Sequence, residues 1–302
     1  MGAAIELKGV TKRFDAKVAV NDVSFEVREG DCYGLIGPNG AGKTTTFSML
    51  CGFLKPTAGH LRVLGVDPFE PGALKQKVGV LPQDALLPAS WPVGTLLTYY
   101  GRLSGLADPE GEARRALERV QLPETWNVRA GTLSHGMTKR VAMAQALMGA
   151  PPVILLDEPT AGLDPKIAAS VRGLIRELKR QHTVVVSSHN MQELEELCDA
   201  TAILDKGLLV SAASMEEITG STAEFRVQVA RGAVPLDEVR ALSGCRDARL
   251  EGSNILCVSF EGQAVQAEDI ITRTVALLAQ REVLILGVWR GRRLEEKVLQ
   301  LT

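Results

Sequence analysis

Short runs of apolar residues alternate with amphipathic stretches over the first 210 residues of the chain. Four of these runs are apolar almost throughout, rather than at every second position: CYGLIG (32–37), VILLD (153–157), TVVVSS (183–188) and TAILD (201–205). Such runs predict strands buried on both faces, as in a parallel sheet covered by helices. Apolar residues at helical spacing predict helices at 42–51, 110–120, 136–149, 165–180 and 190–198. Strands and helices in alternation indicate an α/β fold.

Two segments depart from this alternation. The first 30 residues contain IELKGV and the alternating AVNDVSFEVREG, which predict antiparallel strands beside the main sheet. The stretch from about 92 to 150 has mostly helical spacing. It predicts a helical subdomain inserted into the α/β core.

The pattern changes after a small and polar segment at 211–223. Beyond it, the predicted elements are a strand at 225–230, a helix at 235–244, paired strands at 248–250 and 255–260, a helix at 268–280 and a strand at 282–289. This βαββαβ order is that of ferredoxin-like α+β domains. A last helix is predicted at 292–302. We therefore expect two domains, 1–215 and 223–302.

Composition narrows the class of protein. The chain has 302 residues, with 34 Lys and Arg against 36 Asp and Glu, and this balance gives no electrostatic footprint for nucleic acid. It contains no run of about 18 apolar residues that could span a bilayer, and its start lacks the pattern of a secretory signal. Five cysteines without metal-ligand spacing favour reduced thiols in a cytoplasmic protein. We expect His60 and His182 to lie on the surface.

Residues 37–44 fit the phosphate-binding pattern G-x-x-x-x-G-K-[ST], the P-loop, between a predicted strand and a predicted helix. Glycines let consecutive backbone N–H groups point at phosphate oxygens, and the helix N-terminus adds partial positive charge. We expect Lys43 to reach the β- and γ-phosphates of ATP, Thr44 to bind Mg²⁺ and Thr45 to contact the α-phosphate. The whole expected loop is Gly37, Pro38, Asn39, Gly40, Ala41, Gly42, Lys43, Thr44 and Thr45.

The predicted strand at 153–157 ends in two carboxylates. Asp157 is expected to hold Mg²⁺ through water, and Glu158 is the candidate general base for the attacking water. Taken alone, this pair could equally be two solvated acids at the end of a strand. Its place beside a P-loop favours the phosphate site.

With these motifs in order, about residues 4–212 resemble the ATP-binding cassette (ABC) ATPases. That family has a P-loop NTPase core with an antiparallel β subdomain and a helical subdomain. Gln83, in VGVLPQD, resembles the Q-loop glutamine, which senses Mg²⁺ and water and links to the membrane partner. His189, in SSHN, resembles the switch histidine that contacts the γ-phosphate, and Phe14, in TKRFD, occupies the place of the aromatic residue that stacks on adenine.

Two further motifs imply a dimer. LSHGM (133–137) resembles the LSGGQ signature, and AGLD (161–164) resembles the D-loop, which adds Asp164 to the expected nucleotide site. In the family, the serine and second glycine of the signature, here Ser134 and Gly136, bind the γ-phosphate held by a partner cassette. Two copies would then face each other as a homodimer with two ATP molecules between them.

The signature departs from the family at two positions. His135 stands in place of glycine and Met137 in place of glutamine, whereas Ser134 and Gly136 are retained. We therefore expect function to survive. Phe14 replaces the more usual tyrosine and keeps its stacking face.

The resemblance implies an ATP-hydrolysing subunit of an ABC transporter, peripheral on the inner face of the cell membrane, that drives separate integral membrane permease subunits. The tail resembles the C-terminal extension of exporter-type subunits, which favours export. The alternative is a soluble ABC ATPase acting on ribosomes or DNA. One P-loop, one signature and only about 90 residues between Thr44 and Leu133 count against it. A regulatory role of the tail, through binding of a small ligand, is compatible with the transporter role.

Overall fold

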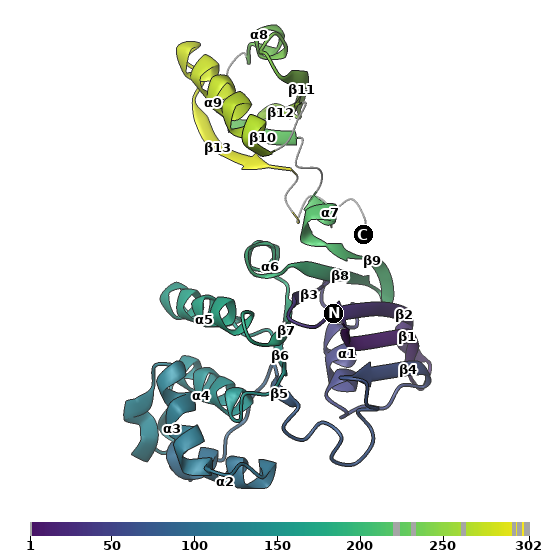
Figure 1. Cartoon of the computed structure of the whole chain (residues 1–302), viewed down its shortest axis with the longest axis vertical. Coiled ribbons are helices and arrows are strands. Elements are labelled where there is room, and N and C mark those ends of the chain that lie inside the picture. The colour runs from purple at the N-terminus through teal and green to yellow at the C-terminus, as the bar shows by residue number, and fades with distance from the viewer. Residues whose placement is uncertain are drawn as a thin grey trace. The chain divides into compact units, whose positions relative to one another are not determined.

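The computed structural model describes residues 2–219, 224–230, 234–260 and 264–291, together with Leu294 and Val298. These residues form two compact units that divide after Ala213 (Figure 1). The helix predicted at 292–302 lies outside the described residues, apart from Leu294 and Val298.

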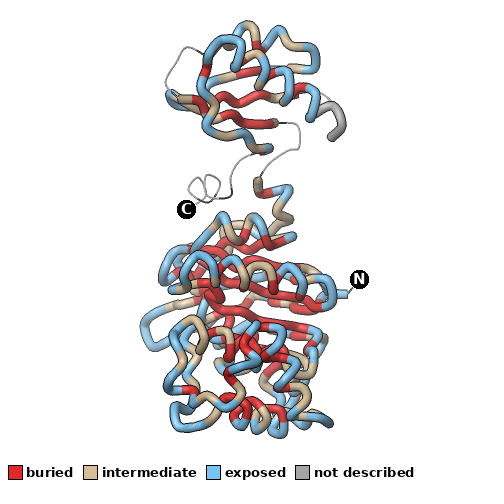
Figure 2. The backbone as a smooth tube through the Cα atoms, turned by 90° about the vertical axis from the view of Figure 1, so that its left-hand side faces the viewer, coloured by how far each residue is buried: buried red, intermediate tan, exposed pale blue. Residues whose placement is uncertain are grey.

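A six-stranded sheet forms the centre of the first unit, with the strand order β5-β6-β7-β3-β8-β9. Its strands are β3 (Cys32–Ile36), β5 (Val78–Leu81), β6 (Val153–Asp157), β7 (Thr183–Ser188), β8 (Ala200–Asp205) and β9 (Leu208–Ser214). The pairs from β5 to β8 are parallel. Every residue of β3, β6 and β7 is buried, as Figure 2 shows in red, which explains why their sequences are apolar without alternation.

A second, antiparallel sheet has the order β2-β1-β4. It consists of β1 (Ala3–Phe14), β2 (Lys17–Arg28) and β4 (Ala58–Val63). Alternate residues of β2, such as Val23, Phe25 and Val27, are buried. They share one hydrophobic core with α1 (Lys43–Leu50) and with Leu155 and Val185 of the central sheet. This shared core fixes the edge of the small sheet against the P-loop helix.

Helices make up the lobe predicted at about 92–150. It contains α2 (Val93–Ser104), α3 (Pro109–Arg119), α4 (His135–Leu147) and two short 3₁₀ turns at Pro123–Asn127 and Ala130–Thr132. Two more helices, α5 (Pro165–Leu178) and α6 (Met191–Leu197), connect the later strands of the central sheet. Figure 1 shows α2, α3 and α4 grouped together at one end of this unit.

The second unit begins with α7 (Met215–Thr219) and contains a four-stranded antiparallel sheet of order β11-β12-β10-β13. Its elements follow as β10 (Glu224–Val229), α8 (Leu236–Arg240), β11 (Cys245–Glu251), β12 (Ile255–Phe260), α9 (Ala264–Gln280) and β13 (Ile285–Arg290). Phe225 and Phe260 lie 6.1 Å apart, between ring centroids, in its core. The βαββαβ order and this strand order are those of a ferredoxin-like fold.

Several details differ from the sequence prediction. The strands β4, β5 and β9 were not predicted. The strand β5 has only four residues, one of them Gly79, the first three residues of β4 are exposed, and β9 runs into the small and polar segment at 211–223. The helix predicted at 235–244 ends at Arg240, and the strand predicted from 282 begins at Ile285. His182 is buried rather than on the surface, because its Nδ1 bonds to the Pro151 carbonyl at 2.8 Å where the chain enters β7.

The burial of β6 can be tested by its effect on the free energy of unfolding. Leu155 is fully buried in the core shared by the two sheets. Leu155→Ala should lower the free energy of unfolding by about 2 to 5 kcal/mol, because it leaves a cavity in a packed interior. Leu208→Ala is the matched control, since Leu208 is 50% exposed and its loss should cost less than about 0.5 kcal/mol. Urea unfolding followed by circular dichroism measures both, and equal losses would contradict the assigned core.

Candidate nucleotide-binding and catalytic site

The P-loop connects β3 to the start of α1. Gly42 caps this helix with a φ of 104°, and a Cβ on it would lie 2.7 Å from the Ala19 carbonyl oxygen. Only glycine fits both constraints. The turn therefore brings the first backbone N–H groups of α1 to an open surface, where the helix dipole favours an anion.

Lys43 follows as the first residue of α1, and only 8% of it is exposed. Its Nζ donates hydrogen bonds to the carbonyl oxygens of Gly37 at 2.6 Å and Pro38 at 3.2 Å. Burial lowers the pKa of this ammonium, while the charges of Glu158 and Asp157 oppose the shift. A nearly buried cation thus lies within the electrostatic reach of two nearly buried acids.

Asp157 and Glu158 stand at the carboxyl end of β6 and are 4% and 6% exposed. The Ser187 hydroxyl at the end of β7 donates a short hydrogen bond to Asp157. Burial raises the pKa of Asp157, this hydrogen bond lowers it, and the neighbouring Glu158 charge raises it further. Burial that raises the pKa of a carboxyl group marks a place where a cation would be stabilising.

The backbone at Glu158 is strained. Its φ is 49°, in the left-handed region, although it has a side chain and precedes Pro159. Such a conformation costs about 1 to 3 kcal/mol and persists only where its surroundings enforce it. The Glu158 N–H donates to the Ser187 backbone oxygen at 3.1 Å and to the Ser187 hydroxyl oxygen at 3.0 Å.

The Glu158 carbonyl is held from the other side. It accepts a turn hydrogen bond from the Ala161 N–H at 3.3 Å and another from the Lys139 ammonium at 2.5 Å. The sequence analysis did not identify Lys139 as part of the site, although the spacing of apolar residues in α4 indicates that its side chain is buried. Lys139 lies at helical spacing from the buried residues Ala142, Met143 and Ala146, so it belongs to the buried face of α4.

His189 is the next neighbour of the Glu158 side chain. Its Nδ1 lies 2.9 and 3.0 Å from the two carboxylate oxygens of Glu158. Because a carboxylate only accepts hydrogen bonds, this contact places a proton on Nδ1. His189 follows β7 and comes to the same edge of the sheet as Glu158, which follows β6.

These groups surround one pocket of about 410 Å³. It is lined by Lys17, Ala19, Asn39, Gly40, Gly42, Lys43, Thr44, Thr45, Gln83, Glu158, Ala161 and His189. The structure therefore brings together most of the P-loop, Gln83, Glu158 and His189. Lys17 and Ala19, at the start of β2, are lining residues that the sequence analysis did not identify.

Other predicted site residues lie outside that lining. Gly37, Pro38 and Ala41 belong to the loop itself, and Ala41 is buried beneath it. Phe14 is 45% exposed at the end of β1, where the Lys12 Nζ lies 5.2 Å from its ring centroid.

The signature segment forms the start of α4, outside the pocket. The Ser134 hydroxyl caps the helix by accepting from the Met137 N–H at 3.3 Å, and Gly136 lies in the first turn. The His135 Nε2 would lie 3.1 Å from a Cβ placed on Gly162, whose φ is 74°. A side chain at position 162 would therefore be strained, and it would crowd His135. Asp164 also lies outside the pocket, and its carboxylate caps α5 through the N–H groups of Lys166 and Ile167.

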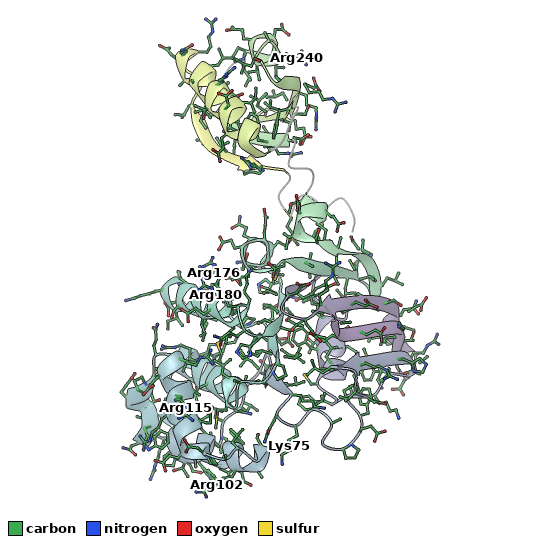
Figure 3. All side chains as sticks on the ribbon, in the orientation of Figure 1. Lys75, Arg102, Arg115, Arg176, Arg180 and Arg240 are labelled. Carbon is green, nitrogen blue, oxygen red and sulfur yellow. The ribbon has the colours of Figure 1, made fainter. Side chains whose placement is uncertain are left out.

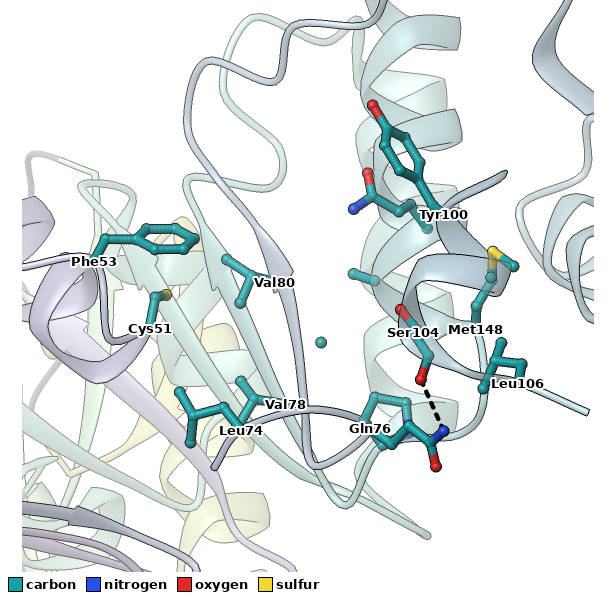
Figure 4. A pocket seen from close by; sticks show the side chains of 15 residues that line it. Cys51, Phe53, Leu74, Gln76, Val78, Val80, Tyr100, Ser104, Leu106 and Met148 are labelled. Atoms are coloured by element: carbon teal, nitrogen blue, oxygen red, sulfur yellow. Dashed lines mark hydrogen bonds between the residues drawn. The ribbon is translucent and has the colours of Figure 1, made fainter. Parts of the chain in front are cut away.

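A second hollow of about 280 Å³ opens elsewhere in the first unit (Figure 4). It lies between the segment after α1, β5 and the helices α2 and α4. Its lining includes Phe53, which is 75% exposed, with Tyr100, Leu106 and Met148. The Gln76 amide donates to the Ser104 carbonyl at 2.8 Å and closes one side of the hollow.

Charges on the helices of this unit are mixed. Figure 3 labels Arg115 on α3 and Arg176 on α5, and both pair with acids: Arg115 with Glu112 at 2.6 Å and Arg176 with Glu196 at 2.9 Å.

Within the described residues, there is no group of three or more His, Cys, Asp or Glu side chains that could hold a metal ion. The described helices also include none with the length and apolar character needed to cross a membrane.

Comparison with known proteins identifies the family. The ABC transporter family model matches residues 20–161. The Nod factor export ATP-binding protein I of Burkholderia lata is 34% identical over 272 residues, which cover 88% of this chain and 89% of that protein.

Solved structures agree. An ATP-binding subunit of an ABC transporter matches with a TM-score of 0.66 and 26% identity over 71% of this chain and 91% of that one. A dimeric bacterial ABC transporter cassette matches with a TM-score of 0.65 and 25% identity over 70% of this chain and 99% of that one. The predicted α/β fold with a P-loop NTPase core is thereby confirmed. The chain belongs to the ABC transporter family, as an ATP-binding subunit with ATPase activity.

Proposed function

We propose that this chain powers an exporter, as an ATP-sandwich homodimer on the inner face of the cell membrane beneath separate permease subunits. ATP hydrolysis by this chain is supported by one observation: Lys43, Glu158 and His189 line a single pocket together with the P-loop. Export is supported by similarity to a Nod factor export protein over 88% of this chain. The ribosome- or DNA-acting alternative is not favoured, since the relative is a transporter subunit.

Hydrolysis follows from the groups that meet in this pocket. The P-loop N–H groups and Lys43 would bind the β- and γ-phosphates, with Thr45 near the α-phosphate and Phe14 against the adenine. Glu158 would accept a proton from the water that attacks the γ-phosphorus. His189 holds the Glu158 carboxylate through its Nδ1 at 2.9 Å, which orients the base toward the same pocket. ADP and phosphate are the products.

Mg²⁺ fits the donor set. Mg²⁺ usually binds through one or two protein oxygens, with waters and phosphates filling its other positions, so it does not need a cage of several acids. Thr44 and Gln83 line the pocket, and the buried Asp157 directly precedes Glu158, which also lines it. We assign Mg²⁺ to Thr44, Gln83 and Asp157. The ion would offset phosphate charge during hydrolysis.

The dimer is inferred from the place of the signature. Ser134 and Gly136 lie at the N-terminus of α4 but do not line the pocket that contains the P-loop. A helix N-terminus favours an anion, so the signature could complete the site of a second copy. In a twofold dimer, each chain would supply both halves, and Asp164 would lie near the shared boundary. The similar bacterial cassette is itself dimeric.

The hollow shown in Figure 4 is the proposed docking site for a permease segment. Apolar side chains line it, and Phe53 is 75% exposed, which is the character of a protein-binding groove. Gln83 lies two residues after β5, which itself lines this hollow through Val78 and Val80. Movement at the pocket could thus reach the permease through a short connection.

Removing the base tests the catalytic assignment. Glu158→Gln should bind ATP and form a stable dimer, but its hydrolysis rate should fall by at least about 100-fold, because an amide cannot accept the proton. Phosphate release and size-exclusion chromatography with ATP measure these effects. Glu118→Gln, an exposed change on α3, is the control. Hydrolysis by Glu158→Gln at the normal rate would show that Glu158 is not the base.

A second variant tests the metal assignment. Asp157→Asn removes the buried carboxylate while keeping its shape. The Mg²⁺ concentration that gives half-maximal hydrolysis should rise by about 10-fold or more, since each metal ligand or its support is worth roughly that much. A titration of Mg²⁺ at saturating ATP measures it. An unchanged Mg²⁺ requirement would exclude Asp157 from the ion site.

The docking groove can be tested in membranes. Tagged Glu158→Gln chain, isolated with ATP from native membranes, should carry a polytopic membrane protein with it. Adding Phe53→Asp should abolish this co-purification, because a charge would lie in an apolar contact. Leu208→Asp, an exposed leucine on β9, should leave co-purification intact. Retention of the membrane protein by the Phe53→Asp chain would place docking elsewhere.

A further inference from the structure

We propose that Lys139 is a positioning residue for ATP hydrolysis: its ammonium group clamps the backbone turn that carries Glu158 and joins that turn to the start of the D-loop. Lys139 itself lies outside the lining of the nucleotide pocket. It would act on the reaction only through the placement of Glu158. The inference rests on the proposed role of Glu158 as the base.

The contacts of Lys139 define the clamp. Its Nζ donates to the Glu158 carbonyl at 2.5 Å and to the Ala161 carbonyl at 3.0 Å. These two carbonyls are the ends of one turn, since the Ala161 N–H donates back to the Glu158 carbonyl at 3.3 Å. One ammonium group therefore bridges the turn from first residue to last. Lys139 is 6% exposed, so its contacts are shielded from water.

The turn needs such support. Glu158 has a φ of 49° before a proline, which its own sequence does not favour. The hydrogen bond from the Ala161 N–H is long, whereas hydrogen bonds from a charged donor are shorter and stronger. The Glu158 N–H is fixed by Ser187 on β7, and its carbonyl is fixed by Lys139 on α4. The two peptide groups that flank the Glu158 Cα are thus each held by a hydrogen bond, which fixes the direction of its carboxylate.

Lys139 is a charged side chain in a buried position, which is unfavourable unless other groups stabilise the charge. Burial lowers the pKa of the Lys139 ammonium, and the charges of Glu158, Asp84 and Asp157 oppose this. A buried lysine is expensive to keep unless its charge is used. Here the ammonium group contacts two carbonyls and is stabilised by the charges of three acids, all of them on or next to the segments that carry the predicted catalytic motifs.

The position of Lys139 also links these segments. It lies five residues after Ser134, so it is one turn into the helix that the signature begins. Lys139 also lines a small hollow of about 170 Å³ with Gln83, Leu86, His135 and Thr138. A shift at the start of α4 would therefore move the Glu158 carbonyl directly. This gives the signature helix of each chain a path to its own base.

The test compares Lys139→Met with variants that keep a donor. Methionine matches the length of lysine but donates no hydrogen bond, so kcat should fall at least about 10-fold. The KM for ATP should stay within about twofold, because the P-loop is untouched. Lys139→Arg and Lys139→Gln should recover part of kcat, and they also serve if the methionine variant does not fold. Unchanged kcat, a loss confined to KM, or no recovery by a donor would overturn the proposal.

Arg140→Met is the matched control. Arg140 is the next residue on α4, but its Nη1 donates to the Val120 carbonyl at 3.3 Å, away from Glu158. This variant also removes a partly buried cation from the same helix. Its thermal midpoint should fall as that of Lys139→Met does, while its kcat should stay within about twofold of the unmodified chain. An equal loss of kcat would assign both effects to a weakened helix.

A double variant separates this inference from the base assignment. If Lys139 acts only through Glu158, Glu158→Gln with Lys139→Met should hydrolyse ATP no more slowly than Glu158→Gln alone. Rate losses that multiply would show that Lys139 acts independently, and the inference would fail. If Glu158→Gln alone keeps the normal rate, the base assignment fails instead. A slow Glu158→Gln with a normal Lys139→Met would reject only the clamp.

Discussion

The first unit is organised by two acids that are kept almost out of water beside a nearly buried ammonium. Asp157, Glu158 and Lys43 are each less than a tenth exposed. Charges in such a place are tolerated only if partners are held at fixed positions. The parallel pairing of β6 with β7 supplies one partner, because it brings Ser187 level with Asp157. The buried strands and the shared core hold these partners in place.

Much of this arrangement could be predicted from sequence. The P-loop and the strands β3, β6 and β7 have patterns that depend on neighbouring residues alone, and a glycine such as Gly42 is required by its own backbone. The second unit was predicted to be ferredoxin-like from the order of its elements. We predicted that this domain begins at residue 223, and that boundary stays a prediction, whereas the two compact units divide after Ala213.

What escaped prediction depends on contacts across the chain. Lys139 appears in the basic run TKR, where a solvated face is the simpler interpretation, and only the packing of α4 shows that it reaches Glu158. Lys17 and Ala19 reach the pocket because β2 packs beside the P-loop. Asp164, which we predicted to lie at the nucleotide site, is an exception, because its carboxylate caps α5 through contacts only two and three residues away. A short acid before a proline is a common helix start, so this structural use was visible in the sequence.

The unusual signature is compatible with the site for a physical reason. Position 135 faces Gly162, which has no side chain, so an imidazole finds room there. At position 137 the backbone N–H, not the side chain, meets the Ser134 hydroxyl, so methionine leaves that cap unchanged. The substituted side chains at 135 and 137 therefore lie where the fold does not depend on the family's usual residues.

Ser134 and Gly136 are retained, and their hydroxyl and backbone groups are the ones that would contact phosphate. The same helix turns Lys139 inward toward Glu158. The first two turns of α4 thus contain both the proposed anion site at Ser134 and Gly136 and the Lys139 contact with Glu158. Through that contact, binding at the start of the helix would act on the proposed base.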